Sequence, residues 1–420
     1  MISLYFGGIR AADAWTLLRA SLAPTASGAR ARRIRFEREI TATHGGACVR
    51  LYGSCRGATT SVLRAAGVGQ GDEVIVTGFT CSAVPVAVRA AGAEPVYADI
   101  DPMTLAITPE TVRPCITPKT RGLIVQHTLG VPADIEALIR LAREHDLVVI
   151  EDCALALGAE RAGRQVGTFG DAAVFSFELS KSVTTGWGGA LVVHNAELAL
   201  NVVTTYEKVP ELPVARVWQR ALQTAICAVL YAPALFSVGR YAVAALFKLG
   251  IFRVSSPAGE DEGRLDSHFV HRMPGPMAAV GAGAWRGLGE RIARMRRAWN
   301  ALREVAQRRG ALLVGLPQAG DVAAAPRFSW LEENRATAER WFAKRGIELG
   351  RWFDAAVAPD PGERGVWIRY TRGACPNGEA IAAEIVNLPT LERLSDADAA
   401  NMAAALDDYF ALEEHDMSKP

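Results

Sequence analysis

Short runs of apolar residues alternate with helix-like stretches between about residues 50 and 195. Apolar runs of this length are typical of buried strands, and the stretches between them repeat their apolar positions at helical spacing. Strands that alternate with helices pair in parallel, and the helices cover both faces of the sheet. The pattern therefore predicts an α/β fold built on a mostly parallel sheet. The expected strands are 73–79, 95–100, 122–128, 147–152, 172–177 and 189–195, and the expected helices are 57–67, 82–92 and 133–145.

The C-terminal part of the chain follows a different pattern. Longer amphipathic helices are expected at 336–346 and 396–410, on either side of a short strand at 365–371. A chain of 420 residues also exceeds the size at which a single core usually stops growing. We therefore expect a large sheet domain over 1–295 and a smaller α+β domain over 296–420.

An apolar insertion interrupts the large domain over about 214–262. Its residues 221–239 carry no charge, and the next charges, Arg240 and Lys248, are widely spaced. The uncharged stretch has the length of a membrane span, but Pro233 and several polar residues make it a poor one. A helical hairpin buried against another subunit or domain, and a pair of helices lying on a membrane surface, are the other interpretations.

Two ionisable residues stand at the ends of expected strands. Lys181 follows the strand at 172–177 and precedes a glycine-rich stretch, while Asp152 ends the strand at 147–152. Sites on open α/β sheets lie at the carboxyl ends of the strands, where both side chains are expected. A lysine near a carboxylate suits pyridoxal phosphate (PLP), because the amine forms a Schiff base and the acid pairs with the ring nitrogen. The alternatives are a solvated surface lysine and a strand-end carboxylate bonded to local backbone N–H groups.

A third candidate is the segment Gly53, Ser54, Cys55, Arg56 and Gly57, immediately before an expected helix. Small residues let the backbone approach an anion, helix-start N–H groups point toward it, and an arginine adds charge. Ordinary helix capping explains the same residue types, so the segment alone does not establish a phosphate site.

Composition excludes some classes of function. A formal net charge of +1 gives no electrostatic basis for binding nucleic acid. The seven cysteines form no CxxC pair and no cluster with zinc spacing, so no metal site is expected and the thiols are expected to be reduced. The N-terminus has no secretory pattern, which makes the cytoplasm the expected location.

Several ordered motifs resemble one known family. They are GDEVIVTGFTCSAVPVAVRAAGAEPVYADIDP, QHTLGVPADI, VVIEDCALALGAE, VGTFGDAAVFSFELSKS, GGALVV and CPNGEAIAAEIVNLPTLERLSDADA. Together they resemble the DegT/DnrJ/StrS family of PLP-dependent aminotransferases, most of which act on sugars. The resemblance implies the aspartate-aminotransferase-like fold type I and PLP as the cofactor. It also implies that Lys181 is the Schiff-base lysine, that Asp152 pairs with the pyridine nitrogen, and that Ser176 binds the phosphate.

The chain departs from the family pattern at several cofactor positions. Leu155 stands where the family has a glutamine that reaches the phenolic oxygen, and Leu157 replaces its usual histidine. Losing the glutamine removes roughly 0.5–1.5 kcal/mol of net hydrogen bonding. Cys55-Arg56 replaces a Gly-Thr phosphate loop, with Arg56 expected to compensate by charge, and Val270 replaces an asparagine donated by the neighbouring subunit. The stacking aromatic corresponds to Cys81, with Phe79 two residues away. The expected cofactor set is Ser54, Cys55, Arg56, Phe79, Cys81, Asp152, Leu155, Ser176 and Lys181.

The resemblance also implies a reaction and a partner. An amino acid, usually glutamate, would donate its amino group to a keto-sugar, expected to be nucleotide-linked, for surface polysaccharide or a glycosylated metabolite. A homodimer with sites at the subunit boundary is expected. Candidate substrate contacts are His127, Glu178, Trp187, Arg272 and Trp352.

Two alternatives remain open. One is a PLP aminotransferase acting on a lipid-linked or non-sugar carbonyl compound, with peripheral membrane contact through 214–250 at the inner face of the membrane. The other is a non-catalytic regulatory member of the family, suggested by the replacements at Leu155, Leu157 and Val270.

Overall fold

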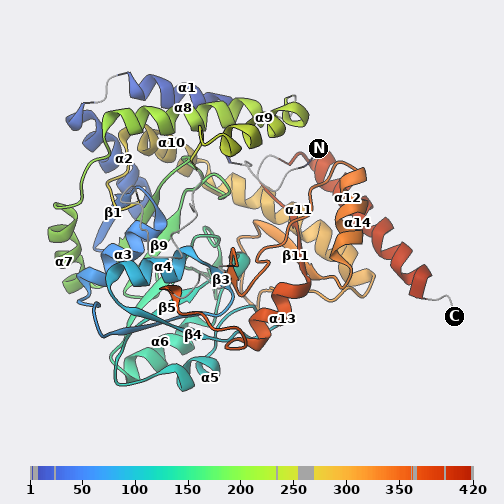
Figure 1. Ribbon diagram of the computed structural model, residues 1–420, viewed down its shortest axis with the longest axis horizontal. Helices are drawn as coiled ribbons and strands as arrows, with labels where there is room; N and C mark the ends of the chain where they lie inside the picture. Colours follow the sequence, from blue (N-terminus) through green and yellow to red (C-terminus); the bar gives the residue numbers. More distant parts are fainter. Residues whose placement is uncertain are drawn as a thin grey trace.

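A seven-stranded sheet forms the centre of the molecule in the computed structural model, which describes residues 2, 8–22, 25–232, 235–253, 269–360, 362, 367–391 and 394–417 (Figure 1). The strand order is β1-β10-β9-β6-β5-β2-β4, and the five strands from β9 to β4 run parallel. β10 pairs antiparallel with both β9 and β1. The predicted α/β fold with a mostly parallel sheet is therefore confirmed. The strands are β1 (Cys48–Tyr52), β2 (Glu73–Thr77), β4 (Glu94–Ala98), β5 (Thr120–Gln126), β6 (Val148–Asp152), β9 (Ala172–Ser176) and β10 (Gly189–Val193).

Helices cover both faces of the sheet, because successive apolar residues of each strand point to opposite sides. Ile124 of β5 packs with helices on one face, whereas its neighbours Leu123 and Val125 pack with α6 on the other. Phe175 of β9 packs against the aromatic cluster around Trp285. One face carries α3 (Cys55–Ala65), α4 (Ala83–Ala91) and α7 (Ala196–Tyr206), and the other carries α2 (Ala26–His44), α6 (Ile135–Glu144) and α10 (Gly275–Arg286).

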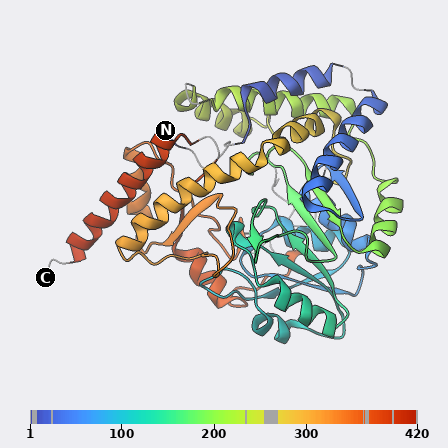
Figure 2. The same ribbon diagram turned by 180° about the vertical axis from the view of Figure 1, so that it is seen from behind.

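The C-terminal region has its own core, built around the aromatic residues Phe328, Trp330 and Phe342. Figure 2 shows α11 crossing the back of the molecule toward this region, and the helix runs through the expected domain boundary between residues 295 and 296. The division into two domains stays a prediction. The elements are α11 (Leu288–Arg308), β11 (Arg327–Leu331), α12 (Arg335–Lys344), α13 (Pro376–Glu384), β13 (Ile385–Pro389) and α14 (Asp396–Met417).

The prediction of a strand at 365–371 was wrong over residues 367–371, the part of it that the structure describes. Residues 367–369 form a short helical turn instead, and residues 370 and 371 have no regular structure. The apolar members Trp367, Ile368 and Tyr370 pack in a small cluster with Val86 and Val357. The short strand of this region is β12 (Val357–Ala358), which pairs in parallel with β3 (Thr80–Cys81) of the N-terminal region. The remaining elements are α5 (Pro109–Val112), η1 (Arg113–Cys115), η2 (Thr128–Gly130), β7 (Glu160–Arg161) and β8 (Arg164–Gln165).

The apolar insertion forms a helical hairpin of α8 (Val214–Leu230) and α9 (Phe236–Lys248). α8 packs along α1 (Ala11–Ser21), and the three helices form one layer at the top of Figure 1. Residues 233, 234 and 254–262 of the expected insertion lie outside the described residues. Among the helices that the structure describes, none has the length and apolar character needed to cross a bilayer.

Candidate functional site

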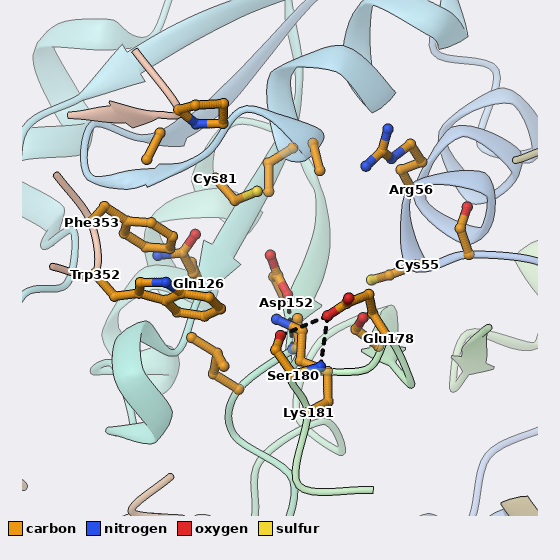
Figure 3. A pocket seen from close by; sticks show the side chains of 18 of the residues that line it. Cys55, Arg56, Cys81, Gln126, Asp152, Glu178, Ser180, Lys181, Trp352 and Phe353 are labelled. Carbon is orange, nitrogen blue, oxygen red and sulfur yellow. Dashed lines mark hydrogen bonds between the residues drawn. The ribbon is translucent and has the colours of Figure 1, made fainter. Parts of the chain in front are cut away.

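A cavity of about 580 Å³ opens at the carboxyl ends of β5, β6 and β9 (Figure 3). The first turn of α3 and Phe269 border it, as do residues 348–354 of the C-terminal region. Because the carboxyl ends of parallel strands share one edge of the sheet, residues far apart in the sequence converge here. The volume is within the range of small-molecule sites, about 300–1,000 Å³.

Lys181 lies on the loop that connects β9 to β10. The loop is held by Glu178, whose carboxylate accepts hydrogen bonds from the backbone N–H of Ser180 (2.9 Å) and from its hydroxyl (2.6 Å). The backbone N–H of Lys181 donates to the carbonyl of Glu178 (3.0 Å). These bonds set the direction of the lysine, whose Nζ lies 5.4 Å from the centre of the Trp352 ring, inside the cavity (Figure 3).

Asp152, at the end of β6, presents a buried carboxylate to the same cavity. Burial raises its pKa, against the opposing effects of a hydrogen bond from the Ala154 N–H (2.9 Å) and of the Lys181 charge. A cation placed beside this carboxylate would lower that pKa again, because it favours the charged form. The site therefore favours a ligand that brings a positive charge to Asp152.

His127 and Glu151 form a fully buried pair beneath the cavity. The Glu151 carboxylate accepts hydrogen bonds from His127 Nε2 (3.1 Å) and from the backbone N–H groups of Gly167, Phe169 and Gly170 (2.7–2.8 Å). Burial tends to raise the pKa of Glu151, but these bonds outweigh it and hold the pKa below its ordinary value. His127 Nδ1 accepts from the Ala133 N–H (3.0 Å), so both ring nitrogens are engaged. The pair supports the end of β6 and does not form an open metal site, although the Cys153 sulfur lies within 4.8 Å.

The first turn of α3 forms the opposite wall of the cavity. Ser54 is its N-cap: its hydroxyl accepts from the Gly57 N–H (3.0 Å) and donates to the Phe269 carbonyl (3.1 Å). The first backbone N–H groups of any helix are not used by the helix itself, so they can donate to an anion. The Arg56 guanidinium lies 4.2 Å from the centre of the Phe269 ring. The capping and anion-binding interpretations of this segment are therefore compatible.

Two aromatic residues of the C-terminal region face this turn across the cavity (Figure 3). The rings of Trp352 and Phe353 are stacked, with centroids 5.8 Å apart and planes 11° from parallel. The guanidinium of Arg327 lies 3.8 Å from the centre of the Trp352 ring. Gln126 of β5 is held beside them, since its amide donates to the Phe79 carbonyl (3.0 Å) and its oxygen accepts from the Thr80 hydroxyl (2.5 Å).

Residues 24–208 match the model of the DegT/DnrJ/EryC1/StrS aminotransferase family. The match runs from just before α2 to just after α7, so it includes Lys181, Asp152 and Ser176. The chain is therefore similar to that family over fewer than half of its residues. The α8–α9 hairpin and the whole C-terminal region lie outside the matched residues, including the segment 375–399 that resembles a family signature.

Curated relatives match the chain over part of its length. An L-glutamine:2-deoxy-scyllo-inosose aminotransferase of Streptoalloteichus tenebrarius is 42% identical over 165 residues, which are 39% of this chain and 39% of that protein. A pleiotropic regulatory protein of Geobacillus stearothermophilus is 45% identical over 159 residues, which are 38% of this chain and 42% of that protein. The matched stretches thus span about two fifths of each relative's own length.

A solved structure is similar over nearly the whole chain. An aminotransferase from Streptoalloteichus hindustanus has a TM-score of 0.72 and 23% identity, covering 99% of this chain and 100% of that one. At this identity the likeness establishes the fold. It confirms the predicted aminotransferase-like fold, including the part that the family model does not match.

PLP is the cofactor that the resemblance to the DegT/DnrJ/EryC1/StrS family implies, and the residues present fit it. The first turn of α3 and the hydroxyl of Ser176 offer donors for a phosphate, while Asp152 offers a buried carboxylate for the ring nitrogen. The buried indole Nε1 of Trp187, also on the cavity wall, has no hydrogen-bond partner among the described residues. A ligand that accepts hydrogen bonds would satisfy it.

Twelve of the predicted cofactor and substrate residues line this one cavity, although their roles stay predictions. Phe79 does not line it: the ring is fully buried and packs edge-on against Phe353, with centroids 5.3 Å apart. Arg272 points elsewhere, donating to the carbonyls of Tyr206 (3.1 Å) and Glu207 (2.8 Å). The residues that the structure brings together are Ser54, Cys55, Arg56, Cys81, His127, Asp152, Leu155, Ser176, Glu178, Lys181, Trp187 and Trp352.

Sequence reasoning missed Gln126, Phe353 and Phe269, all of which line the cavity. Gln126 had a usable signal, because it precedes His127 at the end of an expected strand. Phe353 follows the predicted Trp352, but no strand or motif marked that region. Leu157 lies in the hydrophobic core behind the sheet, and Val270 is half-buried.

Proposed function

We propose that this protein is a PLP-dependent aminotransferase that moves the amino group of glutamate or glutamine to the ring ketone of a polyhydroxylated compound. The observation that carries the proposal is the meeting of Lys181, Asp152 and the first turn of α3 in one cavity. A solvated surface lysine would not share an enclosed cavity with a buried carboxylate. The family match and the confirmed fold support the same conclusion.

The choice of substrates rests on the named relative. The name of that relative gives L-glutamine as donor and 2-deoxy-scyllo-inosose, a keto-cyclitol, as acceptor. A keto-sugar has the same chemistry, a ketone on a ring that carries hydroxyl groups. The nucleotide linkage and the use in surface polysaccharide or a glycosylated metabolite stay predictions, as does the homodimer.

The chain's own residues have distinct tasks in this reaction. Bound PLP supplies a carbonyl that amines can condense with and a ring that accepts electrons. Ser176, the α3 N-terminus and the Arg56 charge would hold its phosphate. Asp152 would hold a negative charge beside the ring nitrogen, where a proton is kept.

Proton transfer would be the task of Lys181. Its Nζ would take the proton from the α-carbon of the donor and, in the second half of the reaction, deliver a proton to the carbon that receives the amino group. Trp352 and Phe353, which close the cavity opposite α3, would exclude water from that exchange.

The test is a two-stage assay on the purified full chain with added PLP. We expect a visible absorption band from covalently bound cofactor, which glutamate or glutamine then bleaches while releasing a keto acid. Keto-cyclitols, free keto-sugars and nucleotide-linked keto-sugars are then supplied in turn, and the true acceptor restores the band. Absence of the band with added PLP would contradict the proposal. If only nucleotide-linked keto-sugars restore the absorption band, the prediction of a nucleotide-linked acceptor is established.

The regulatory alternative is supported by the name of the relative from Geobacillus stearothermophilus. The same assay decides it. Keto acid released from the donor in proportion to protein would exclude a non-catalytic role.

A further inference from the structure

Apolar side chains lie on the outward stripe of α8 as well as on its buried one. Val217, Ala221 and Ala225 face inward, while Leu222 and Val229, seven residues apart, are 51% and 46% exposed. A surface helix of a globular protein normally carries polar residues on its outer side. The outer side of α8 is therefore more apolar than expected for a helix that faces only water.

α9 and the segment after it repeat this arrangement. Val243 and Phe252 face inward and pack with Leu179 and Cys227. The outward side chains include Val238 and Tyr241, which are 73% and 64% exposed, and the apolar side chains Leu249 and Ile251 follow at its C-terminal end. Exposed apolar side chains are thus present on both helices of the hairpin.

α1, beside α8, adds an exposed tryptophan. Trp15 is 66% exposed and Leu22 is 73% exposed, with the exposed Arg19 between them along the same stripe. Figures 1 and 2 both place α1, α8 and α9 together along one edge of the molecule. Ten of the fifteen large apolar side chains that are exposed in the described part of the chain lie on these helices or at their ends.

Charge distinguishes this face from the rest of the protein. The whole chain balances 46 basic residues against 45 acidic ones, yet residues 212–259 contain no Asp or Glu and five basic residues. Of the five, Arg220 is buried and bonded to His271. The others are Arg216, Arg240, Lys248 and Arg253, and they are half-buried or exposed. The face therefore combines apolar side chains with positive charge alone along the hairpin.

We propose that this outer face of α1, α8 and α9 binds the surface of a membrane rich in anionic lipids. Helices that lie in the membrane interface carry Trp, Leu and Phe on one side and Lys or Arg beside them. Each basic residue near an anionic surface contributes attraction, which acidic residues would cancel. A second copy of the chain fits less well, because two-fold pairing sets a patch against itself and would oppose its basic residues. The proposal does not rest on the aminotransferase activity.

The test is co-sedimentation of the full-length protein with vesicles. One set is pure phosphatidylcholine, and the other is phosphatidylcholine mixed with phosphatidylglycerol. We expect binding to the mixed vesicles, weakened by salt, and little binding to the neutral ones. Binding to neither set would overturn the proposal.

Two variants separate the apolar and the electrostatic contributions. The triple variant L222Q/V238Q/L249Q removes exposed apolar groups, and K248E/R253E reverses two charges. Each should weaken binding to the mixed vesicles by about tenfold or more, because the first variant removes apolar area that would enter the membrane interface and the second reverses charges that anionic lipids attract. The matched controls are L200Q/L312Q and K208E/K344E, which alter exposed residues elsewhere and should bind as the wild type does.

The oligomeric state tells whether a second copy of the chain, and not a membrane, covers this face. Light scattering of the wild type and of L222Q/V238Q/L249Q without vesicles should give the same mass. A dimer that falls to a monomer in this variant, together with no vesicle binding by the wild type, would show that the face is a subunit interface and would overturn the proposal. The keto-acid assay is independent of vesicles, so failure here leaves the proposed activity standing.

Discussion

The sheet domain around the cavity and the α8–α9 hairpin beside it use apolar residues in opposite ways. In the sheet, the neighbouring residues Ile124 and Val125 are buried on opposite faces. Even the charged Glu151 is buried there, and four N–H groups donate hydrogen bonds to its carboxylate. In the hairpin, Leu222 and Val238 are exposed, with basic residues nearby. The sheet is matched to a family and the hairpin is not. The family match is thus limited to the sheet and the helices on it, while the hairpin is available for a contact of this chain's own.

The largest effect is expected at Lys181. Replacing it by alanine removes the amine that would bind the cofactor and move protons, so turnover should fall by roughly 10³-fold or more. The measurement is keto-acid release together with the visible absorption band. Lys119→Ala, at an exposed lysine outside the cavity, is the control and should leave both unchanged. Full turnover in the Lys181 variant would show that the sheet edge is not the reacting centre.

Glu151→Gln tests how much the hydrogen bonds to the buried Glu151 carboxylate stabilise the region of the sheet. Both carboxylate oxygens of Glu151 accept hydrogen bonds from backbone N–H groups. The NH₂ of the introduced glutamine would therefore face at least one N–H donor in either orientation. We expect the free energy of unfolding to fall by about 3 kcal/mol. Denaturant unfolding measures this change. Glu290→Gln, at an exposed i,i+4 pair with Arg294, should cost about 0.5 kcal/mol or less.

The same variant has a defined pH dependence. Because the folded protein holds the pKa of Glu151 below its ordinary value of 4.5, its stabilisation is complete above that pH and is lost as the pH falls through the folded pKa. The stability difference between wild type and Glu151→Gln should therefore shrink on acidification below about pH 4.5. A difference that grows at low pH would contradict the lowered pKa.

Gly189→Ala tests how closely the α3 turn must approach the sheet. A Cβ at this position would overlap the backbone nitrogen of Cys55, so the first turn of α3 would shift. We expect a loss of about 1–3 kcal/mol in stability. We also expect about tenfold weaker binding of PLP, which fluorescence titration measures, because helix-start N–H groups would be displaced from the phosphate. The control is Gly69→Ala, where the nearest atom to the added carbon is the Ala91 carbonyl oxygen at 3.9 Å.

The smallest effect is expected on the outer side of the hairpin. Val243→Ala removes a buried group between α8, α9 and Leu179 and should cost about 1–3 kcal/mol. Leu222→Ala removes an exposed group and should change stability by about 0.5 kcal/mol or less. Thermal unfolding of the two variants makes the comparison. Equal losses would show that Leu222 is buried in the assembled protein.

Local pattern was sufficient for most of the sheet domain, because burial on both faces leaves nearly continuous apolar runs in the sequence. It was insufficient where the chain ends a strand early: the expected strand 122–128 stops at Gln126, and Thr128 begins a short helical turn. Pattern also could not show that β10 runs antiparallel, since hydrophobic periodicity carries no direction. Both sides of the hairpin contain apolar residues, so its outward side could be identified only from the packed structure.

The sequence by itself determined the α/β class, the strand that precedes Lys181, the strand that Asp152 ends, and the family resemblance, because these depend on residue type and local order. Only the tertiary structure decided which distant residues share the cavity. It placed Trp352 and Phe353 opposite α3, and it turned Phe79 and Arg272 away from the site. The reason is physical: strand pairing and helix packing bring together positions hundreds of residues apart, and the direction of each side chain depends on partners that no local pattern names.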